Sequence, residues 1–121
     1  ILGEYNMDVV CLGGHIVERP YMLAGDETVE NALRYHADKA FFSVSAFTID
    51  GRISTGSRYH LLHKVMLRNS KKTYFLADRS KVSDSFSQEL CDFSSLNGVI
   101  SDFEFPQETQ KNFPNTQFIC V

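Results

Sequence analysis

Thr73–Lys81 reads TYFLADRSK, an apolar run that ends in a cluster of polar residues. The apolar part predicts a buried strand over Thr73–Ala77, and Asp78 predicts its end. Two runs of the same kind follow, Gly98–Ser101 (GVIS) and Gln117–Val121 (QFICV). Short strands that are apolar throughout are typical of a parallel sheet that is covered on both faces.

Upstream of this stretch, apolar runs alternate with helical patterns. Strands are predicted over Met7–Leu12 (MDVVCL), which Gly13-Gly14 closes, and over Ala40–Ala46 (AFFSVSA). Helices are predicted over Asp26–His36, with Asp26 as N-cap, and over Ser57–Asn69, with Ser57 as N-cap. The remaining predictions are a turn at Asp50-Gly51, mostly loop over Arg79–Leu96 with a short strand or helix around Phe86–Cys91, and helical turns over Pro106–Asn112. This alternation predicts an α/β domain with a mainly parallel sheet flanked by helices.

Composition limits the classes of function. A chain of 121 residues fits one domain, and a net charge of −3 argues against a DNA-binding or anionic-membrane surface. The apolar runs are too short to span a bilayer. The three cysteines form no Cys-x-x-Cys pair, so neither a disulfide framework nor a zinc knuckle is expected. Cys11 and Cys120 lie in apolar runs, which predicts buried free thiols in a reducing, cytoplasmic setting.

Ligands of parallel α/β sheets bind outside the carboxyl ends of the strands. That rule selects Gly13-Gly14, Ser43–Thr48, Asp78–Lys81 and Ser101-Asp102. Lys81 has the chemistry to neutralise a phosphate and Asp78 to accept from a sugar hydroxyl, the alternative being an ordinary polar turn. Ser54–Ser57 is either an anion site at a helix start or a plain N-cap.

Other polar side chains carry weaker signals. Helical geometry alone makes Lys64 a solvated lysine. His60 and His63 stand at i, i+3 without a carboxylate or thiol at ligand spacing, so we expect surface histidines and no metal site.

The ordered segments resemble one known family. They are CLGG (11–14), LAGDETVENAL (23–33), AFFSVSAFTIDGRISTG (40–56), a helix with Lys64-Val65-Met66, YFLADRSK (74–81) and GVISD (98–102). Together they resemble the C-terminal effector-sensing domain of the DeoR family of bacterial transcription repressors, from Val9 to about Asp102. Phe47-Thr48-Ile49-Asp50 departs from the glycine that usually precedes Ile-Asp in that family.

The resemblance implies a Rossmann-like fold related to ribose-5-phosphate isomerase and the CoA transferases. It implies a sensor for a phosphorylated sugar or sugar-derived metabolite in a repressor of carbohydrate metabolism genes, with no cofactor. The expected ligand residues are Ser43, Ser45, Thr55, Gly56, Lys64, Asp78 and Lys81. The family's DNA-binding head and its Asp-Ser-Gly-Thr-Thr-like loop have no counterpart here, so we expect residues 1–121 to be a single partial domain. An incomplete sheet leaves an open edge, which predicts a homo-oligomer.

Two alternatives to a sensor stay open. A sugar-phosphate isomerase needs a carboxylate base beside the sugar, and the stretch Ser43–Phe47 contains none. The sequence therefore favours binding without turnover, and we expect no enzyme activity. The other alternative is an oligomerisation piece that has no ligand of its own.

Overall fold

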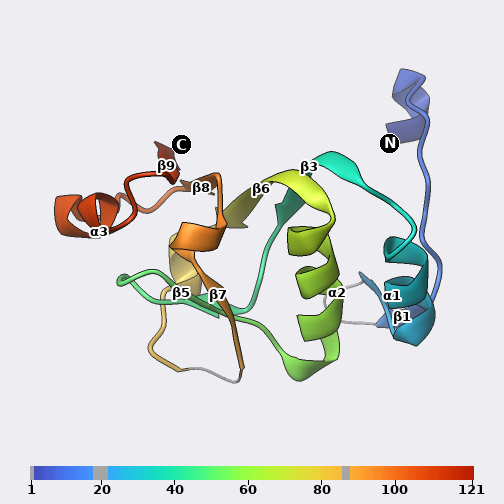
Figure 1. Cartoon of the computed structure of the whole chain (residues 1–121), viewed down its shortest axis with the longest axis horizontal. Helices are drawn as coiled ribbons and strands as arrows, with labels where there is room; N and C mark the ends of the chain where they lie inside the picture. The colour runs from blue at the N-terminus through green and yellow to red at the C-terminus, as the bar shows by residue number, and fades with distance from the viewer. Residues whose placement is uncertain (1, 18–21, 86–87) are drawn as a thin grey trace.

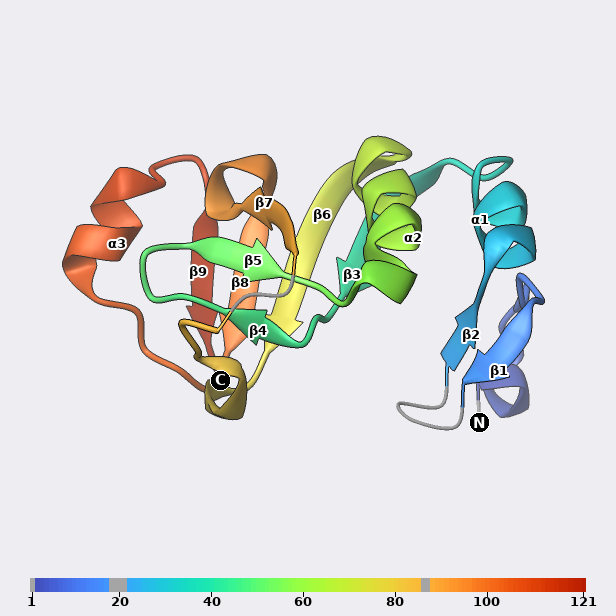
Figure 2. The ribbon, with the colours of Figure 1, turned by 90° about the horizontal axis from the view of Figure 1, so that it is seen from below.

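The main sheet of the molecule is built from parallel strands (Figure 1, Figure 2). The computed structural model describes residues 2–17, 22–85 and 88–121. Within these residues the sheet order is β3 (Ala37–Phe42), β6 (Ser70–Ala77), β8 (Gly98–Ser101) and β9 (Gln117–Cys120). Helix α2 (Ser57–Arg68) lies in the long connection from β3 to β6, and α3 (Gln107–Asn112) lies in the connection from β8 to β9. The predicted α/β class with a Rossmann-like parallel sheet is confirmed.

A small antiparallel sheet covers one face of the main sheet (Figure 2). Its strands, in spatial order, are β4 (Ala46–Phe47), β5 (Arg52–Ser54) and β7 (Glu89–Asp92). The hairpin between β4 and β5 turns at Asp50-Gly51, as predicted, where the amide of Gly51 donates to the carbonyl of Thr48. The single strand predicted over Ala40–Ala46 is wrong. The chain leaves the main sheet after Phe42 and enters the second sheet at Ala46, and a local apolar pattern does not show which sheet a residue joins.

The segment predicted as mostly loop, residues 79–96, contains more regular structure than expected. It holds the 3₁₀ turns η2 (Arg79–Lys81) and η3 (Phe93–Ser95) on either side of β7. The short element predicted around Phe86–Cys91 is this strand, shifted to Glu89–Asp92, and residues 86 and 87 of the predicted range lie outside the described residues.

The N-terminal part differs most from the sequence prediction. After the 3₁₀ turn η1 (Leu2–Tyr5), Met7–Leu12 is extended and mostly exposed and is not a strand. No strand of the described chain lies beside it to take its backbone hydrogen bonds. The Gly13-Gly14 turn is present, with φ of +75° and +110°, and leads into the hairpin of β1 (His15–Val17) and β2 (Met22–Ala24).

Two cysteine predictions are wrong for the same reason. Cys11 lies in the unpaired N-terminal segment, and Cys120 lies on β9, the outer strand of the main sheet; both are exposed. Apolar neighbours in sequence bury a thiol only when another layer packs over it.

No helix in the described residues is long and apolar enough to cross a membrane.

The helix starts lie one residue earlier than predicted. Gly25 precedes α1 (Asp26–Ala32) and Gly56 precedes α2, so Asp26 and Ser57 are the first helical residues and not the N-caps. Helix α1 also ends before Leu33 and His36, which are exposed. A carboxylate in the first turn still favours the helix, because it lies at the positive end of the helix dipole.

The core lies between the two sheets and is rich in phenylalanine. Phe47, Phe75 and Phe93 are fully buried, and Phe105 packs edge-on against Phe93 with ring centroids 5.3 Å apart. A smaller cluster of Ala32, Leu62 and Val65 joins α1 to α2. Aromatic packing therefore holds the main sheet from one face, and the parallel pairing of its strands places their carboxyl ends at one edge.

Candidate functional site

An open pocket of about 480 Å³ lies at the carboxyl edge of the main sheet. Ser43 follows β3, Asp78 follows β6 and Asp102 follows β8, and all of them line it together with Lys81 and Ser101. Its floor is apolar and comes from Leu76, Ala77, Ile100 and Val121. Because neighbouring strands are parallel and in register, side chains that are far apart in sequence meet here.

The cation of this pocket is Lys81, at the end of the turn η2. Its Nζ donates to the hydroxyl oxygen of Ser43 at 2.6 Å, and its backbone amide donates to the carbonyl of Asp78 at 3.0 Å. The ammonium is thereby held over the end of β3. An ammonium beside a hydroxyl is a pair that binds phosphate or carboxylate oxygens.

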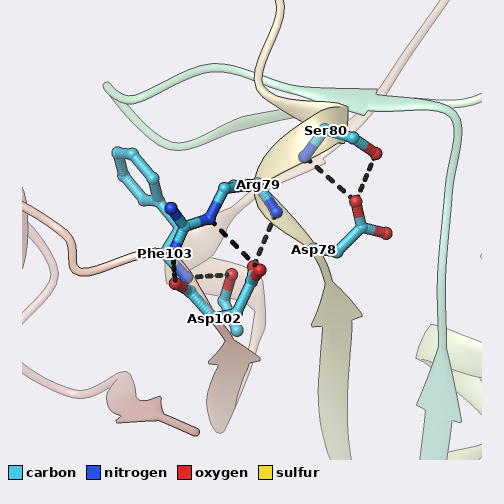
Figure 3. Close-up of polar contacts among 6 residues, drawn as sticks. Asp78, Arg79, Ser80, Asp102 and Phe103 are labelled. Atoms are coloured by element: carbon cyan, nitrogen blue, oxygen red, sulfur yellow. Dashed lines mark hydrogen bonds and ion pairs between the residues drawn. The ribbon is translucent and has the colours of Figure 1, made fainter.

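Asp78 shapes the turn that carries Lys81. Its Oδ1 accepts from the backbone amide of Ser80 at 3.0 Å and also from the Ser80 hydroxyl (Figure 3). The hydrogen bond from the hydroxyl lowers the pKa of Asp78 most, and the bond from the amide lowers it further. The carboxylate is therefore ionised at neutral pH and is a weak proton acceptor.

Arg79 links this turn to the loop after β8 (Figure 3). Asp102 accepts from the backbone amide of Arg79 at 2.7 Å and from Nε at 3.2 Å through its carboxylate, and from Nη2 at 2.9 Å through its carbonyl. Sequence reasoning marked Ser101-Asp102 as a strand end but gave Asp102 no role and did not select Arg79. The two residues are 23 positions apart, so no local pattern joins them.

Ser45, Thr55 and Gly56 lie near the start of α2 and do not line this pocket. The hydroxyl of Ser45 donates to the carbonyl of Ser54 at 3.3 Å, and Gly56 is the N-cap of α2. Thr55 is buried, with Oγ1 at 3.0 Å from Nδ1 of His63.

The expectation that the histidines are surface residues is wrong for His63. It is buried, and its ring lies 5.6 Å from that of Phe42, which ends β3. Burial, and then the nearby His60, lowers the pKa of His63, so the ring is neutral at physiological pH. In His60, Nδ1 is buried and has no hydrogen-bond partner among the described residues. The hint in the sequence was helical spacing: Met66 and Leu67 stand three and four residues after His63, and both pack against the core.

Lys64 lies elsewhere. It is exposed and lines a separate groove of about 540 Å³ between α2 and β7, together with Arg68, Leu90 and Cys91. The structure thus brings together Ser43, Asp78 and Lys81 of the predicted ligand residues.

No group of three or more His, Cys, Asp or Glu side chains within residues 2–17, 22–85 and 88–121 is arranged to hold a metal ion. The chemistry of the pocket is one of hydrogen bonds and charges. It offers one ammonium, hydroxyls and carboxylates over an apolar floor.

Comparisons with known proteins point to transcription regulators. The family model described as the DeoR C-terminal sensor domain matches residues 1–103. The HTH-type transcriptional regulator YulB of Bacillus subtilis is 26% identical over 98 residues, which cover 80% of this chain and 38% of the relative. A putative aga operon transcriptional repressor of Escherichia coli O157:H7 is 22% identical over 110 residues, covering 90% of this chain and 41% of the relative. An L-fucose operon activator of Haemophilus influenzae is 25% identical over 112 residues, covering 92% and 45%. The chain spans less than half the length of these relatives.

Proposed function

This chain belongs to the DeoR C-terminal sensor domain family, and we propose that it binds a phosphorylated sugar or sugar-derived metabolite as the effector of a transcription regulator. The aga repressor and the fucose activator regulate operons named for sugars, which supports a carbohydrate-derived effector. DNA would be bound by a separate domain of the regulator. We expect this action in the cytoplasm, where sugar phosphates and DNA occur together.

The observation that carries the proposal is the contact between Lys81 and Ser43 at the carboxyl edge of the sheet. The ammonium would bind the phosphate, and the hydroxyl would stay within reach of the same anion. Asp78 keeps its second carboxylate oxygen pointing away from Ser80 (Figure 3), where it would accept from a sugar hydroxyl. Ser45, Thr55 and Gly56 lie outside this pocket, so they would contact an effector only at a separate place near the start of α2, and Lys64 would do so only in the groove beside β7.

We propose binding without catalysis. Isomerisation of a sugar phosphate needs a carboxylate that accepts a proton from carbon near neutral pH. At this edge Asp78 has a lowered pKa, and both carboxylate oxygens of Asp102 accept from Arg79. A sugar phosphate incubated with the chain should stay unchanged by NMR, and a turnover that Asp78→Asn abolishes would instead favour an isomerase.

Titration of the intact chain with sugar phosphates tests the proposed ligand. We expect an aldohexose 6-phosphate or ribose 5-phosphate to bind and the unphosphorylated sugar to bind at least tenfold more weakly. Loss of one charge-assisted hydrogen bond costs about 1.5–3 kcal/mol, so Lys81→Gln should weaken binding by about 10- to 150-fold. Lys64→Gln is the matched control. Equal weakening by both variants would show that the phosphate does not bind in the Lys81 pocket. No binding of any sugar phosphate would contradict the proposal.

We also propose that the chain forms a homo-oligomer through β3. This strand is an outer edge of the main sheet as described, and on it the half-exposed Phe41 stacks on Tyr74 with ring centroids 5.2 Å apart. An identical edge from a second copy offers matching donors and acceptors, because two copies pair about a twofold axis. Light scattering should report a dimer that Phe41→Lys dissociates. A monomer at every accessible concentration would contradict this.

A further inference from the structure

We propose that Arg79 is a positioning residue of the pocket: by joining Asp102 it fixes the turn that holds Lys81 over Ser43 before a ligand arrives. This inference rests on the proposed function for its ligand, whereas its geometry rests on the hydrogen bonds of Arg79 and Lys81. Arg79 itself does not line the pocket, whereas Asp102 and Lys81 do.

The link between Arg79 and Asp102 joins the loops of two adjacent strands. Arg79 is the second residue after β6, and Asp102 directly follows β8. The carboxylate of Asp102 accepts hydrogen bonds from the backbone amide and the guanidinium of Arg79. The guanidinium also donates to the carbonyl of Asp102 (Figure 3). A planar guanidinium with several fixed donors determines orientation as well as distance, which an ammonium does not.

This link has little to do with folding stability. The side chains of Arg79 and Asp102 are 71% and 43% exposed. Ion pairs with that exposure contribute little to the free energy of folding, because water and salt screen them. A contact of three hydrogen bonds that adds little stability is better explained by what it holds in place.

Lys81 lies between two anchors of the same segment. On one side is the Arg79–Asp102 link. On the other, Val82 bridges to Phe47 and the amide of Ser83 donates to the Phe47 carbonyl at 2.9 Å. Without the Arg79 side chain the turn keeps the second anchor and the backbone contact to Asp102, and Lys81 is free to sample more orientations.

The link has an electrostatic consequence too. Asp102 lines the pocket, and an unpaired carboxylate there would repel a phosphate. Positioning and neutralisation make different predictions for a double variant. If Arg79 only neutralised Asp102, removing both charges in Arg79→Ala/Asp102→Asn would restore binding, whereas a positioning role leaves the double variant weak.

The test uses the intact chain, with glucose 6-phosphate and inorganic phosphate as probes followed by NMR titration. We expect Arg79→Ala to weaken probe binding at least fivefold and Arg79→Lys to recover only part of it. Arg79→Ala/Asp102→Asn should stay at least threefold weaker than the unmodified chain. Arg52→Ala is the matched control. Nε of Arg52 lies 3.4 Å from Oδ2 of Asp50 in an exposed ion pair outside this pocket.

A second readout needs no ligand. Amide hydrogen exchange of Lys81 and Val82 should become at least tenfold faster in Arg79→Ala and should not change in Arg52→Ala. Unchanged exchange, or full recovery of binding in the double variant, would overturn the positioning role. If the unmodified chain binds neither probe, the proposed function is what fails, and the exchange rates alone then decide whether Arg79 holds the turn.

Discussion

Gly51→Ala should destabilise the fold strongly, for two reasons that the structure separates. Gly51 has a φ of +98°, a backbone conformation that costs an L-residue about 1–2 kcal/mol. A Cβ at this position would lie 2.5 Å from Cε2 of Phe113 and 3.1 Å from Cδ2 of Phe93. Overpacking of a filled core costs about 1–3 kcal/mol. The sum is a loss of about 2–5 kcal/mol in the free energy of unfolding.

Urea denaturation followed by circular dichroism measures this loss. With a slope of about 2 kcal/mol/M, the transition midpoint should fall by about 1–2.5 M. Gly56→Ala is the matched control, because Gly56 has a φ of −64° and a Cβ there would lie 3.8 Å from Tyr59, an ordinary contact. That variant should change the free energy of unfolding by less than about 1 kcal/mol.

A comparison of the two variants decides the argument. Equal loss of stability in Gly51→Ala and Gly56→Ala would refute the claim that the turn between β4 and β5 requires glycine. Phe113→Leu in the Gly51→Ala background should relieve the clash and leave the backbone cost. If the added substitution recovers nothing, the packing part of the estimate is wrong.

Further predictions concern the core, a thiol and a buried imidazole. Phe93→Ala should lower the free energy of unfolding by about 3–5 kcal/mol in the same assay, since Phe93 is fully buried; a loss below about 1 kcal/mol would contradict its central position. Burial raises the pKa of Cys91 to about 12, so in the native chain iodoacetamide should modify the exposed Cys11 and Cys120 well before Cys91; equal rates would count against this packing. Burial lowers the pKa of His63 below the usual 6.5, so the unfolded chain binds that proton more readily. The free energy of unfolding should therefore fall as pH drops below about 6.5, and His63→Gln should lose part of this dependence; an identical pH profile would show that His63 is not buried neutral.

Elements with a strong local pattern are predictable from sequence. Gly98–Ser101 forms β8 as expected, and the Thr73–Ala77 run lies inside β6. Such short runs of mostly apolar residues between turn residues are a local strand pattern, and the fully buried Phe75 and Val99 fit it, although Leu76 on β6 is partly exposed. The Asp50-Gly51 turn is predictable for a similar reason, since the turn itself requires the positive φ of Gly51.

Partners remote in sequence are not predictable in this way. Met7–Leu12 has the composition of a buried strand and yet is exposed, because a strand exists only where another strand takes its hydrogen bonds. The same limit applies to Cys120, which the apolar run at the end of the chain appeared to bury.

The same distinction between local and remote features applies to the candidate site. The sequence by itself determined that Asp78 and Lys81 follow a strand and that the strand ends are where ligands bind, because strand length and polar endings are local properties. Tertiary structure alone decided that Lys81 meets Ser43, 38 positions away, and that Arg79 meets Asp102. Contacts between strand ends depend on strand order and register, which the packing of the whole chain sets and which no short stretch of residues encodes.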